Sequence, residues 1–496
     1  MTARRPDRRG NLDVDQLTSA GTRHGSSKLA RRRGFSSTLV VVGVFAGTAS
    51  IFSVACSDDV IATADTTLDA GTDVSRETPD TSVPPPPPPT DAGVDPDARG
   101  PYDPADVPVV CDASPCATQI VAGSDHFCTR MSDSTVRCWG KNQSGVLGNS
   151  SAGAGSDAGT TTRDVGGLSG ITQLSASERN NCALLEDGSV KCWGANDYYQ
   201  LGITTNRYGA HPVPNTVPLP STATRVELGP YHACAFLSSG ELWCWGADPY
   251  LQHLRNDAEF EANPIRARLP GRAQIEPLAL TDLAMSNNTL FGISEQGEVW
   301  SWGAVGGDDG TIAGRVGSIT PDTTPKRLAS LEKVTSLAAS PLLNTYPIRM
   351  RGHACANANG EVYCWGRSYA GALCTGVPDE EREPAHAPFP STLPTWPQQL
   401  AAGDEITCAR MTDGSVYCCG SDVRGRLGTG AMISMSPFFT KAAAFTGRAV
   451  QVATSNQAVC ALVEDGTVEC WGSNQNGELG MRPDDEDHPT PVKVAF

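Results

Sequence analysis

The sequence predicts an all-β repeat protein, and three observations carry this prediction. Glycine (51) and proline (36) are plentiful while aromatic residues make up only 6% of the 496 residues. This composition favours turns and short strands over helices. Apolar residues at helical spacing are scarce. A unit ending in Trp-Gly or a close variant occurs seven times, with its glycine at positions 140, 194, 246, 303, 366, 420 and 472. Such self-similarity is the signature of a repeat architecture.

Each unit opens with a short apolar strand, as in ITQLSAS (171–177), followed by two alternating runs around a turn. In the second copy, CALLEDGSVKCWG (182–194), a three-residue turn centred on Asp187 places Cys182 opposite Cys192. Directly opposed residues of antiparallel strands lie within disulfide range. The fifth copy is one residue shorter and has the two-residue signal Asn359-Gly360, which again makes its two cysteines face each other. The fourth copy has Phe291 and Ser301 at these positions, so both cysteines are missing together.

Six hairpin disulfides are therefore predicted: Cys128–Cys138, Cys182–Cys192, Cys234–Cys244, Cys355–Cys364, Cys408–Cys418 and Cys460–Cys470. Zinc binding is the alternative. Structural zinc sites usually combine two close cysteine pairs, whereas each copy here offers two ligands and the sequence has no Cys-x-x-Cys. The total of 17 cysteines indicates an oxidising compartment.

The repeat resembles a known family. Gly-x-x-His, a Cys-bearing hairpin around Asp-Gly, Cys-Trp-Gly-x-Asn and Gly-x-Leu-Gly are similar to the repeats of the regulator of chromosome condensation family. GSDHFC (123–128) and CWGKNQSGVLG (138–148) show the pattern best. The resemblance covers about residues 110–496 and implies a seven-bladed β-propeller of four-stranded antiparallel blades. It further implies that PVKVAF (491–496) completes the first blade beside ATQIVAG (117–123), which removes an open sheet edge.

Several copies depart from this pattern. Ser134 replaces the turn glycine of copy one, and GADPYLQHL (246–254) lacks the Gly-x-Leu-Gly ending, so irregular third and fourth blades are expected. Cys419 replaces a tryptophan and Cys374 replaces the last glycine of its loop. Because these two departures occur in adjacent copies, a Cys374–Cys419 bond is predicted. A Cys111–Cys116 bond is predicted where the ring begins.

The first 55 residues read as an export signal. Arginines make the start basic, FSSTLVVVGVFAGTASIFSVA (35–55) is apolar, and small residues precede Cys56. SVAC (53–56) resembles a bacterial lipobox, which implies that Cys56 becomes lipid-modified after cleavage, although Ser53 stands where leucine is usual. RRGF (32–35) is a weak match to a twin-arginine signal. An uncleaved transmembrane anchor and a nucleic-acid arm are the alternatives. We expect a lipoprotein of the bacterial cell envelope, at the outer membrane or cell surface.

Residues 56–110 are expected to form a disordered, acidic tether rich in proline and threonine. The stretch after Cys56 holds twelve Asp/Glu and two Arg, with six prolines in a row at 84–89. It lacks the apolar residues that would offset the entropy of ordering. The net charge of the whole chain is −17, and the first 55 residues contribute nine Lys/Arg against three Asp/Glu. The remaining chain is therefore more acidic still, which excludes nucleic acid as a partner.

Candidate chemical sites are few, and no cofactor, metal or catalytic residue is expected. His126, His232 and His353 share one repeat position and are predicted to form a repeated hydrogen bond rather than a metal site, because they are spread around the ring. The acidic run 484–488 is predicted to be a solvated loop, with calcium binding as the alternative. Gly-x-Ser-x-Gly, His-Glu-x-x-His and phosphate-loop motifs are absent from the sequence. The tryptophans before the repeat glycines are predicted to be core residues.

We expect a monomeric propeller, held to the membrane by its lipid, that binds a protein or glycan through its loops. A structural envelope component and a propeller lyase or hydrolase are the alternatives. The family's founding member is a nucleotide-exchange factor, but no exchange motif is carried over to this sequence. Insertions in repeat folds collect on one face, and the largest here are 304–330 and 375–397. The second forms the candidate partner-binding loop, with Glu380, Glu381, Arg382, Glu383, His386, Phe389 and Trp396.

Overall fold

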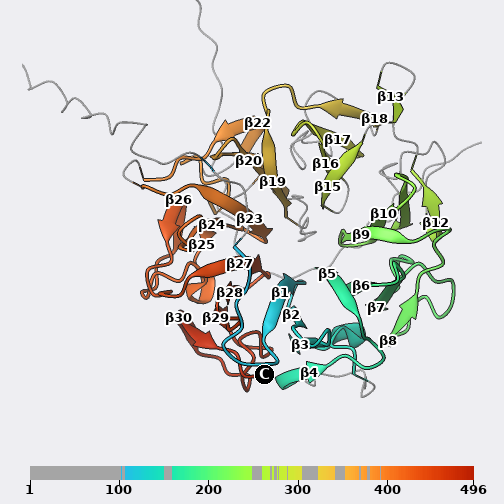
Figure 1. Cartoon of the computed structure of the whole chain (residues 1–496). Coiled ribbons are helices and arrows are strands. Elements are labelled where there is room, and N and C mark those ends of the chain that lie inside the picture. Colours follow the sequence, from blue (N-terminus) through green and yellow to red (C-terminus); the bar gives the residue numbers. More distant parts are fainter. Residues whose placement is uncertain are drawn as a thin grey trace, which may run out of the picture. The chain divides into compact units, whose positions relative to one another are not determined.

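The predicted propeller is confirmed by the computed structural model. It describes residues 102, 107–149, 159–247, 260–267, 271–272, 276–277, 279–286, 289–303, 322–340, 352–367, 370–376, 380–390 and 393–496. These residues form seven four-stranded antiparallel sheets, the blades, arranged around a common centre (Figure 1). The predicted signal peptide, Cys56 and the tether as far as residue 101 lie outside the described residues. Within the described part, no helix is long and apolar enough to cross a membrane.

Every blade is built from one continuous stretch of chain, with its first strand nearest the centre. Blades one to three consist of β1 (Ala117–Ala122), β2 (His126–Met131), β3 (Val136–Gly140) and β4 (Gly159–Asp164); β5 (Ile171–Ser177), β6 (Asn180–Leu185), β7 (Val190–Gly194) and β8 (His211–Thr216); and β9 (Ala223–Leu228), β10 (His232–Leu237), β11 (Leu242–Ala247) and β12 (Phe260–Arg266).

The short ribbon β13 (Gly271–Arg272) and β14 (Glu276–Pro277) precedes blade four. Blades four to seven consist of β15 (Leu280–Met285), β16 (Thr289–Ser294), β17 (Val299–Gly303) and β18 (Asp322–Arg327); β19 (Val334–Ala339), β20 (Gly352–Ala358), β21 (Glu361–Arg367) and β22 (Glu380–His386); β23 (Pro397–Gly403), β24 (Ile406–Met411), β25 (Val416–Ser421) and β26 (Met435–Lys441); and β27 (Ala449–Thr454), β28 (Ala458–Val463), β29 (Val468–Ser473) and β30 (Asp487–Lys493). Blades three and four have the same four strands as the others, whereas residues 248–254, on which the expected irregularity rests, lie outside the described residues.

The turns set the predicted hairpin register. Cys182 pairs with Cys192 across β6 and β7, and Gly188 has the left-handed backbone that this turn requires (φ +77°). In blade five both turn residues, Asn359 and Gly360, have positive φ, as a type I′ turn demands. Phe291 pairs with Ser301 in blade four. All six hairpin disulfides are present, each with its Cα atoms 4.1 Å apart.

The predicted closing strand is wrong. Residues Asp487–Lys493 form β30, the outer strand of blade seven, which pairs with β29 and not with blade one. The inner strand of blade one, β1, is likewise paired only within its own sheet. The sequence of 491–496 suits a strand. Which neighbouring strand it pairs with depends on the preceding loop, and this loop brings the chain back along β29.

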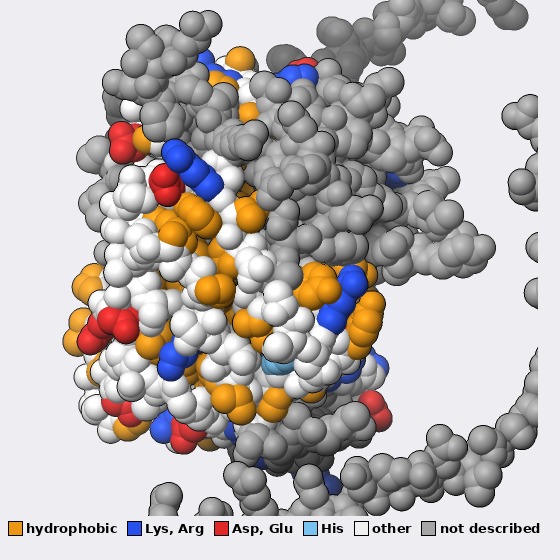
Figure 2. All heavy atoms as spheres, turned by 90° about the vertical axis from the view of Figure 1, so that its right-hand side faces the viewer, with side chains coloured by type: hydrophobic (Ala, Val, Ile, Leu, Met, Phe, Trp, Pro, Cys, Tyr) orange, Lys and Arg blue, Asp and Glu red, His pale blue; other side chains and the backbone are white. Residues whose placement is uncertain are grey.

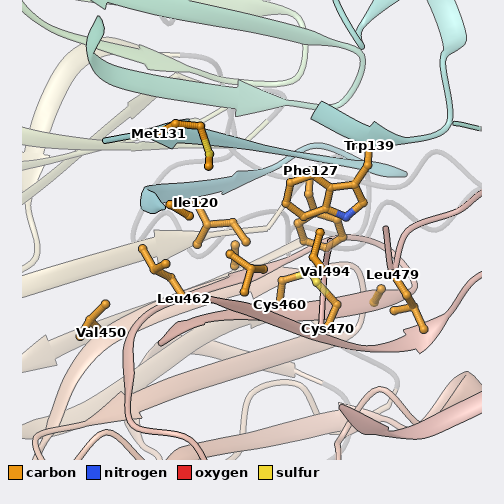
Figure 3. Packing of buried hydrophobic residues seen from close by; sticks show 14 residues of the cluster. Ile120, Phe127, Met131, Trp139, Val450, Cys460, Leu462, Cys470, Leu479 and Val494 are labelled. Carbon is orange, nitrogen blue, oxygen red and sulfur yellow. A yellow bond between two sulfur atoms is a disulfide. The ribbon is translucent and has the colours of Figure 1, made fainter. Parts of the chain in front are cut away.

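Side chains and chain ends close the ring instead. Val110 N–H and Asp112 N–H donate to the carbonyls of Glu464 and Asp465 in blade seven, so the N-terminal segment lies on that blade. At the other end, buried Val494 joins the core shared by blades one and seven, which also contains Phe127 and Trp139 (Figure 3). Each end of the propeller therefore packs on the blade formed by the other end.

Candidate functional site

The repeated tryptophan joins each blade to the preceding one. Its side chain is fully buried at all six described positions where it occurs: Trp139, Trp193, Trp245, Trp302, Trp365 and Trp471. Four of the indoles donate from Nε1 to a carbonyl of the loop that follows the third strand of the preceding blade: Trp139 to Glu478, Trp193 to Val146, Trp245 to Gln200, and Trp471 to Arg426, at 2.8–2.9 Å. Each acceptor is the residue before Leu-Gly. The Gly-x-Leu-Gly motif is therefore a docking loop, and the predicted core role of the tryptophans is confirmed.

The Cys374–Cys419 disulfide takes the place of this contact between blades five and six. The last glycine of a docking loop lies against the next tryptophan, since a Cβ on Gly428 would come within 2.7 Å of Nε1 of Trp471. Cys374 stands at that glycine position and Cys419 at that tryptophan position. Replacing both partners by cysteine brings the two sulfurs together, with Cα atoms 5.5 Å apart. The predicted bond is confirmed, as is Cys111–Cys116.

The repeated histidines also serve the joints between blades. His126 and Asn181 are linked by a 3.0 Å hydrogen bond between blades one and two, and His353 and Thr407 by a 2.7 Å bond between blades five and six. Burial lowers the pKa of His353 and of His232 to about 4, so these imidazoles are neutral at pH 7. The structural hydrogen bond predicted for this position is confirmed at His126 and His353. Among the described residues, no group of three or more His, Cys, Asp or Glu side chains could hold a metal ion.

A belt of side chains surrounds the central cavity, which has a volume of about 360 Å³ and is lined by the inner strands of all seven blades. Its members occupy the third position of each inner strand. Gln119 shows how it works: its Nε2 donates to the carbonyl of Leu174 and its Oε1 accepts the N–H of the same residue, at 2.9 and 2.8 Å. The side-chain amide therefore pairs with the next blade as a neighbouring strand does.

The glutamine clamp recurs around the ring. Gln173 bonds both backbone groups of Val226, and Gln399 bonds both groups of Val452. Gln451 accepts the N–H of Ile120 and so links blade seven to blade one. Sequence reasoning missed this belt, because a polar residue in a strand of alternating polarity is predicted to face solvent.

Charged groups replace the clamp between blades three and four. Arg225 donates to the carbonyl of Thr281 and pairs with the carboxylates of Asp282 and Glu227. Arginine cannot accept a hydrogen bond, so it cannot bind the N–H of Leu283 as a glutamine would. Asp282 accepts this N–H instead. Burial, with a smaller contribution from the neighbouring Asp282, raises the pKa of Glu227 to about 7, against the opposite effects of Arg225 and Gln173. Glu227 also accepts hydrogen bonds from Gln173 and Ser175 of blade two, so its carboxylate contributes to the neighbouring joint as well.

The predicted partner-binding loop is largely an element of the fold. Glu380, Glu381, Arg382, Glu383 and His386 lie in β22, the outer strand of blade five, so their assignment to an inserted loop is wrong. Phe389 stacks on Phe439 of blade six with ring centroids 4.2 Å apart. Trp396 is half-buried and meets Tyr102 edge-on. These contacts indicate a packing role for both aromatic residues. Partner binding by this segment stays a prediction.

The acidic run 484–488 is folded on itself. Asp484 accepts hydrogen bonds from Asn474 Nδ2 and the N–H of Glu486, and lies 2.9 Å from Nε2 of His488. Asp487 pairs with Arg424 of blade six. The carboxylates therefore hold the loop and attach it to its neighbour.

The alternation of strands gives the propeller two distinct faces. The turns between second and third strands lie on one face, here the turn face, and the connections between third and fourth strands lie on the other, the loop face. The N-terminal segment meets the turn face, since Val110 and Asp112 bond the turn of blade seven and Tyr102 bonds Thr335 and Asn357 of blade five. The chain therefore enters the propeller on the turn face.

Exposed apolar side chains are concentrated in one stretch of blade six, in its loop-face connection and the adjoining outer strand. Of nine large hydrophobic side chains that are exposed among the described residues, five fall between 423 and 438. They are Val423, Met432, Ile433, Met435 and Phe438, with exposed fractions of 37–55%. The buried Asp422 carboxylate accepts the N–H groups of Leu427 and Ile433, so the connection that carries these residues is folded. We call these five residues the blade-six patch.

These features define a class of protein: a seven-bladed β-propeller of tandem repeats joined by docking loops. The regulator of chromosome condensation (RCC1) repeat matches at residues 117–146, 171–200, 223–252, 398–426 and 449–478, and a second form of the same repeat matches at 187–236 and 359–410. The chain belongs to the regulator of chromosome condensation repeat family, as its sequence motifs predicted.

The curated relatives are distant. The chain is 24% identical over 367 residues to the ultraviolet-B receptor UVR8 of Arabidopsis thaliana, a match that covers 73% of this chain and 78% of the receptor. It is 28% identical over 347 residues to the regulator of chromosome condensation of Mus musculus, covering 66% and 78%. The crystal structure of Prp20p from Saccharomyces cerevisiae superposes with a TM-score of 0.59 at 18% identity, covering 77% of this chain and 88% of Prp20p. This structural likeness shows the fold.

Proposed function

We propose that this protein is an exported, lipid-anchored propeller that binds a protein partner through its loop face. The observation that carries the proposal is the blade-six patch, because monomeric proteins rarely gather exposed apolar side chains in one place without a partner for them. Prp20p, described with its binding properties to Gsp1p and histones, shows that a propeller of this fold can bind proteins. A glycan partner and a purely structural envelope role are the competing proposals.

The point at which the chain joins the propeller leaves the loop face available to a partner. Lipid attachment at Cys56 would hold the chain at a membrane, and the tether would reach the propeller at Tyr102 and Val110 on the turn face. The loop face would then be free of the attachment point. Fractionation of cells that make the Cys56→Ser variant tests the anchor. If the protein is a lipoprotein, the variant should lose both cleavage of the signal peptide and labelling by lipid. Identical lipid labelling of the variant and the unmodified chain would contradict it.

Photo-crosslinking tests the binding surface. A photoreactive phenylalanine derivative is placed at position 438 of the full chain, in the cells that make it. It should give a crosslinked adduct in which the added partner is digested by proteases. The matched control is the same derivative at Asp413, an exposed residue in the turn of the same blade, on the opposite face. An adduct at position 413 with none at 438, or an adduct at 438 that proteases leave unchanged, would contradict the proposal.

A further inference from the structure

A bulky residue occupies a glycine position in the docking loop of blade two. The docking loops of blades one, five, six and seven begin with Gly145, Gly371, Gly425 and Gly477, whose φ angles are +77° to +84°. Tyr199 takes this place in blade two, with φ +62°. The turn has the same hydrogen bond in both versions, since Gly202 N–H donates to Tyr199 as Gly148 N–H donates to Gly145. The left-handed backbone disfavours a non-glycine residue by about 1–2 kcal/mol, and the turn itself does not require the tyrosine.

The Tyr199 ring belongs to an ordered group of side chains. The guanidinium of Arg207 lies 4.8 Å from the centroid of the Tyr199 ring and 5.1 Å from that of Tyr208. Nε of Arg207 donates to the carbonyl of Asp197 at 2.7 Å, which fixes the guanidinium between the two rings. Tyr208 is 79% exposed, the largest exposed fraction among the large hydrophobic side chains of the described residues. An open aromatic ring is thus held in place by a stacked arginine.

The group continues onto blade three. Tyr198, next to Tyr199, packs against Tyr231 with ring centroids 4.5 Å apart. Tyr231 neighbours Glu178, and Arg179 pairs with Asp197 at 3.1 Å. Tyr231 lies in the turn between the first two strands of its blade, so it is on the loop face like the blade-two connection. Tyr198, Tyr199, Arg207, Tyr208 and Tyr231 are called the tyrosine–arginine cluster from here on.

We propose that the tyrosine–arginine cluster is a second protein-binding surface, separate from the blade-six patch. Tyrosine and arginine are enriched at the energetic centres of protein interfaces, and tyrosine provides a large amphipathic contact at low conformational cost. Here Arg207 contacts both rings before any partner binds, and such preorganisation lowers the entropy that association loses. Residues whose backbone conformation is disfavoured gather at functional sites. Figure 2 views the side where β8, β10 and β12 lie in Figure 1 and shows hydrophobic side chains (orange) next to Lys or Arg (blue).

The partner that fits is a protein surface with an apolar centre that covers Tyr208 and polar groups for the charged rim. The acidic chain, at −17, argues against nucleic acid. A glycan and a second copy of this chain are the other possible occupants, and both are outcomes of the test below.

The first experiment places the photoreactive phenylalanine derivative at position 208 of the full chain in the producing cells. The same derivative at Asp187, an exposed residue in the turn of blade two on the opposite face, is the control. We expect a protein adduct at 208 and none at 187. An adduct to carbohydrate, an adduct to a second copy of the chain, or no adduct at 208 would overturn the proposal. An adduct at 438 but not at 208 would overturn this inference and leave the proposed function standing.

The second experiment measures the affinity of the purified full chain for the protein identified in that adduct. Tyr208→Ala and Arg207→Ala should each weaken binding about tenfold or more. Val213→Ser, at an exposed apolar residue of the neighbouring strand β8, should leave it unchanged. Tyr199→Gly separates binding from structure: we expect weaker binding together with a higher urea midpoint, because the strained backbone is relieved. A lower urea midpoint with unchanged affinity would show a structural tyrosine and overturn the proposal.

Discussion

Glu227 makes the joint between blades three and four sensitive to pH. Its folded-state pKa of about 7 lies above the ordinary value of 4.5, so the folded chain holds the proton more tightly than the unfolded chain. The free energy of unfolding should therefore decrease as pH rises from about 4.5 to 7. We predict that Glu227→Gln removes this decrease, with a difference from the unmodified protein on the order of 1 kcal/mol between pH 5 and pH 8.

Urea unfolding at the two pH values, with disulfides intact, measures this difference. Glu186→Gln, in the exposed turn of blade two, is the control and should leave the pH dependence unchanged. Parallel pH profiles for Glu227→Gln and the unmodified protein would contradict the prediction. Arg225, Asp282 and Gln173 act on the pKa of Glu227, and the hydroxyl of Ser175 also donates to its carboxylate. Sequence reasoning passed over all of these residues, because their positions in short alternating strands do not reveal that inner strands of successive blades bring them together.

At the scale of elements, the Cys374–Cys419 bond should contribute more stability than a hairpin bond. It closes a sequence separation of 45 residues, whereas Cys182–Cys192 closes one of 10. The chain-entropy model gives about 4 kcal/mol for the longer loop and about 3 kcal/mol for the shorter one. The stability that a hairpin disulfide adds is smaller than this value, because the turn already holds both strands together. We predict a larger loss of unfolding free energy for Cys374→Ser with Cys419→Ser than for Cys182→Ala with Cys192→Ala.

Urea unfolding of both double variants checks this order, and equal losses would contradict it. A rescue variant sharpens the test. Cys374→Gly with Cys419→Trp recreates the glycine–tryptophan contact that Gly428 and Trp471 make one blade further on. This pair should recover part of the stability that the two serines lose.

The elements that could be predicted are those whose geometry is local. Turn length fixed the facing cysteines in every hairpin, since register in a hairpin follows from its turn. The outer strands could not be recognised in the same way. In β22 three glutamates, an arginine and Pro384 resemble a loop, because edge strands carry charges and proline that discourage pairing with other chains. The blade-six patch and the tyrosine–arginine cluster were missed because exposure depends on the fold.

At the scale of the whole molecule, the last three residues contribute to closure of the ring between blades one and seven. Val494 is buried between blades one and seven, the carbonyl of Ala495 accepts a hydrogen bond from Thr162, and Phe496 meets Trp139 edge-on. We predict that removal of residues 494–496 lowers the free energy of unfolding by about 2–4 kcal/mol. Amide exchange should increase first in β4 and β30, measured by mass spectrometry.

Phe496→Ala is the graded control. Phe496 is 37% exposed, so this variant should lose less stability than the deletion. Unchanged exchange in β30 after the deletion would show that the joint does not need these residues. The sequence did not reveal this closure, because a strand completing blade one and a tail packing on it both suit the apolar residues of PVKVAF.

The continuous origin of each blade has a consequence for oxidative folding. Sixteen cysteines pair in the described ring, yet seven of the eight bonds join residues no more than ten positions apart. Each of those thiols therefore meets its partner as soon as its own segment has emerged, before later cysteines can compete. Cys419 is the exception: it follows Cys418 directly and its partner lies one blade earlier. The mispairing that we expect most readily is thus Cys408 with Cys419. A disulfide isomerase acting on this protein would have to exchange bonds only at the adjacent cysteines Cys418 and Cys419.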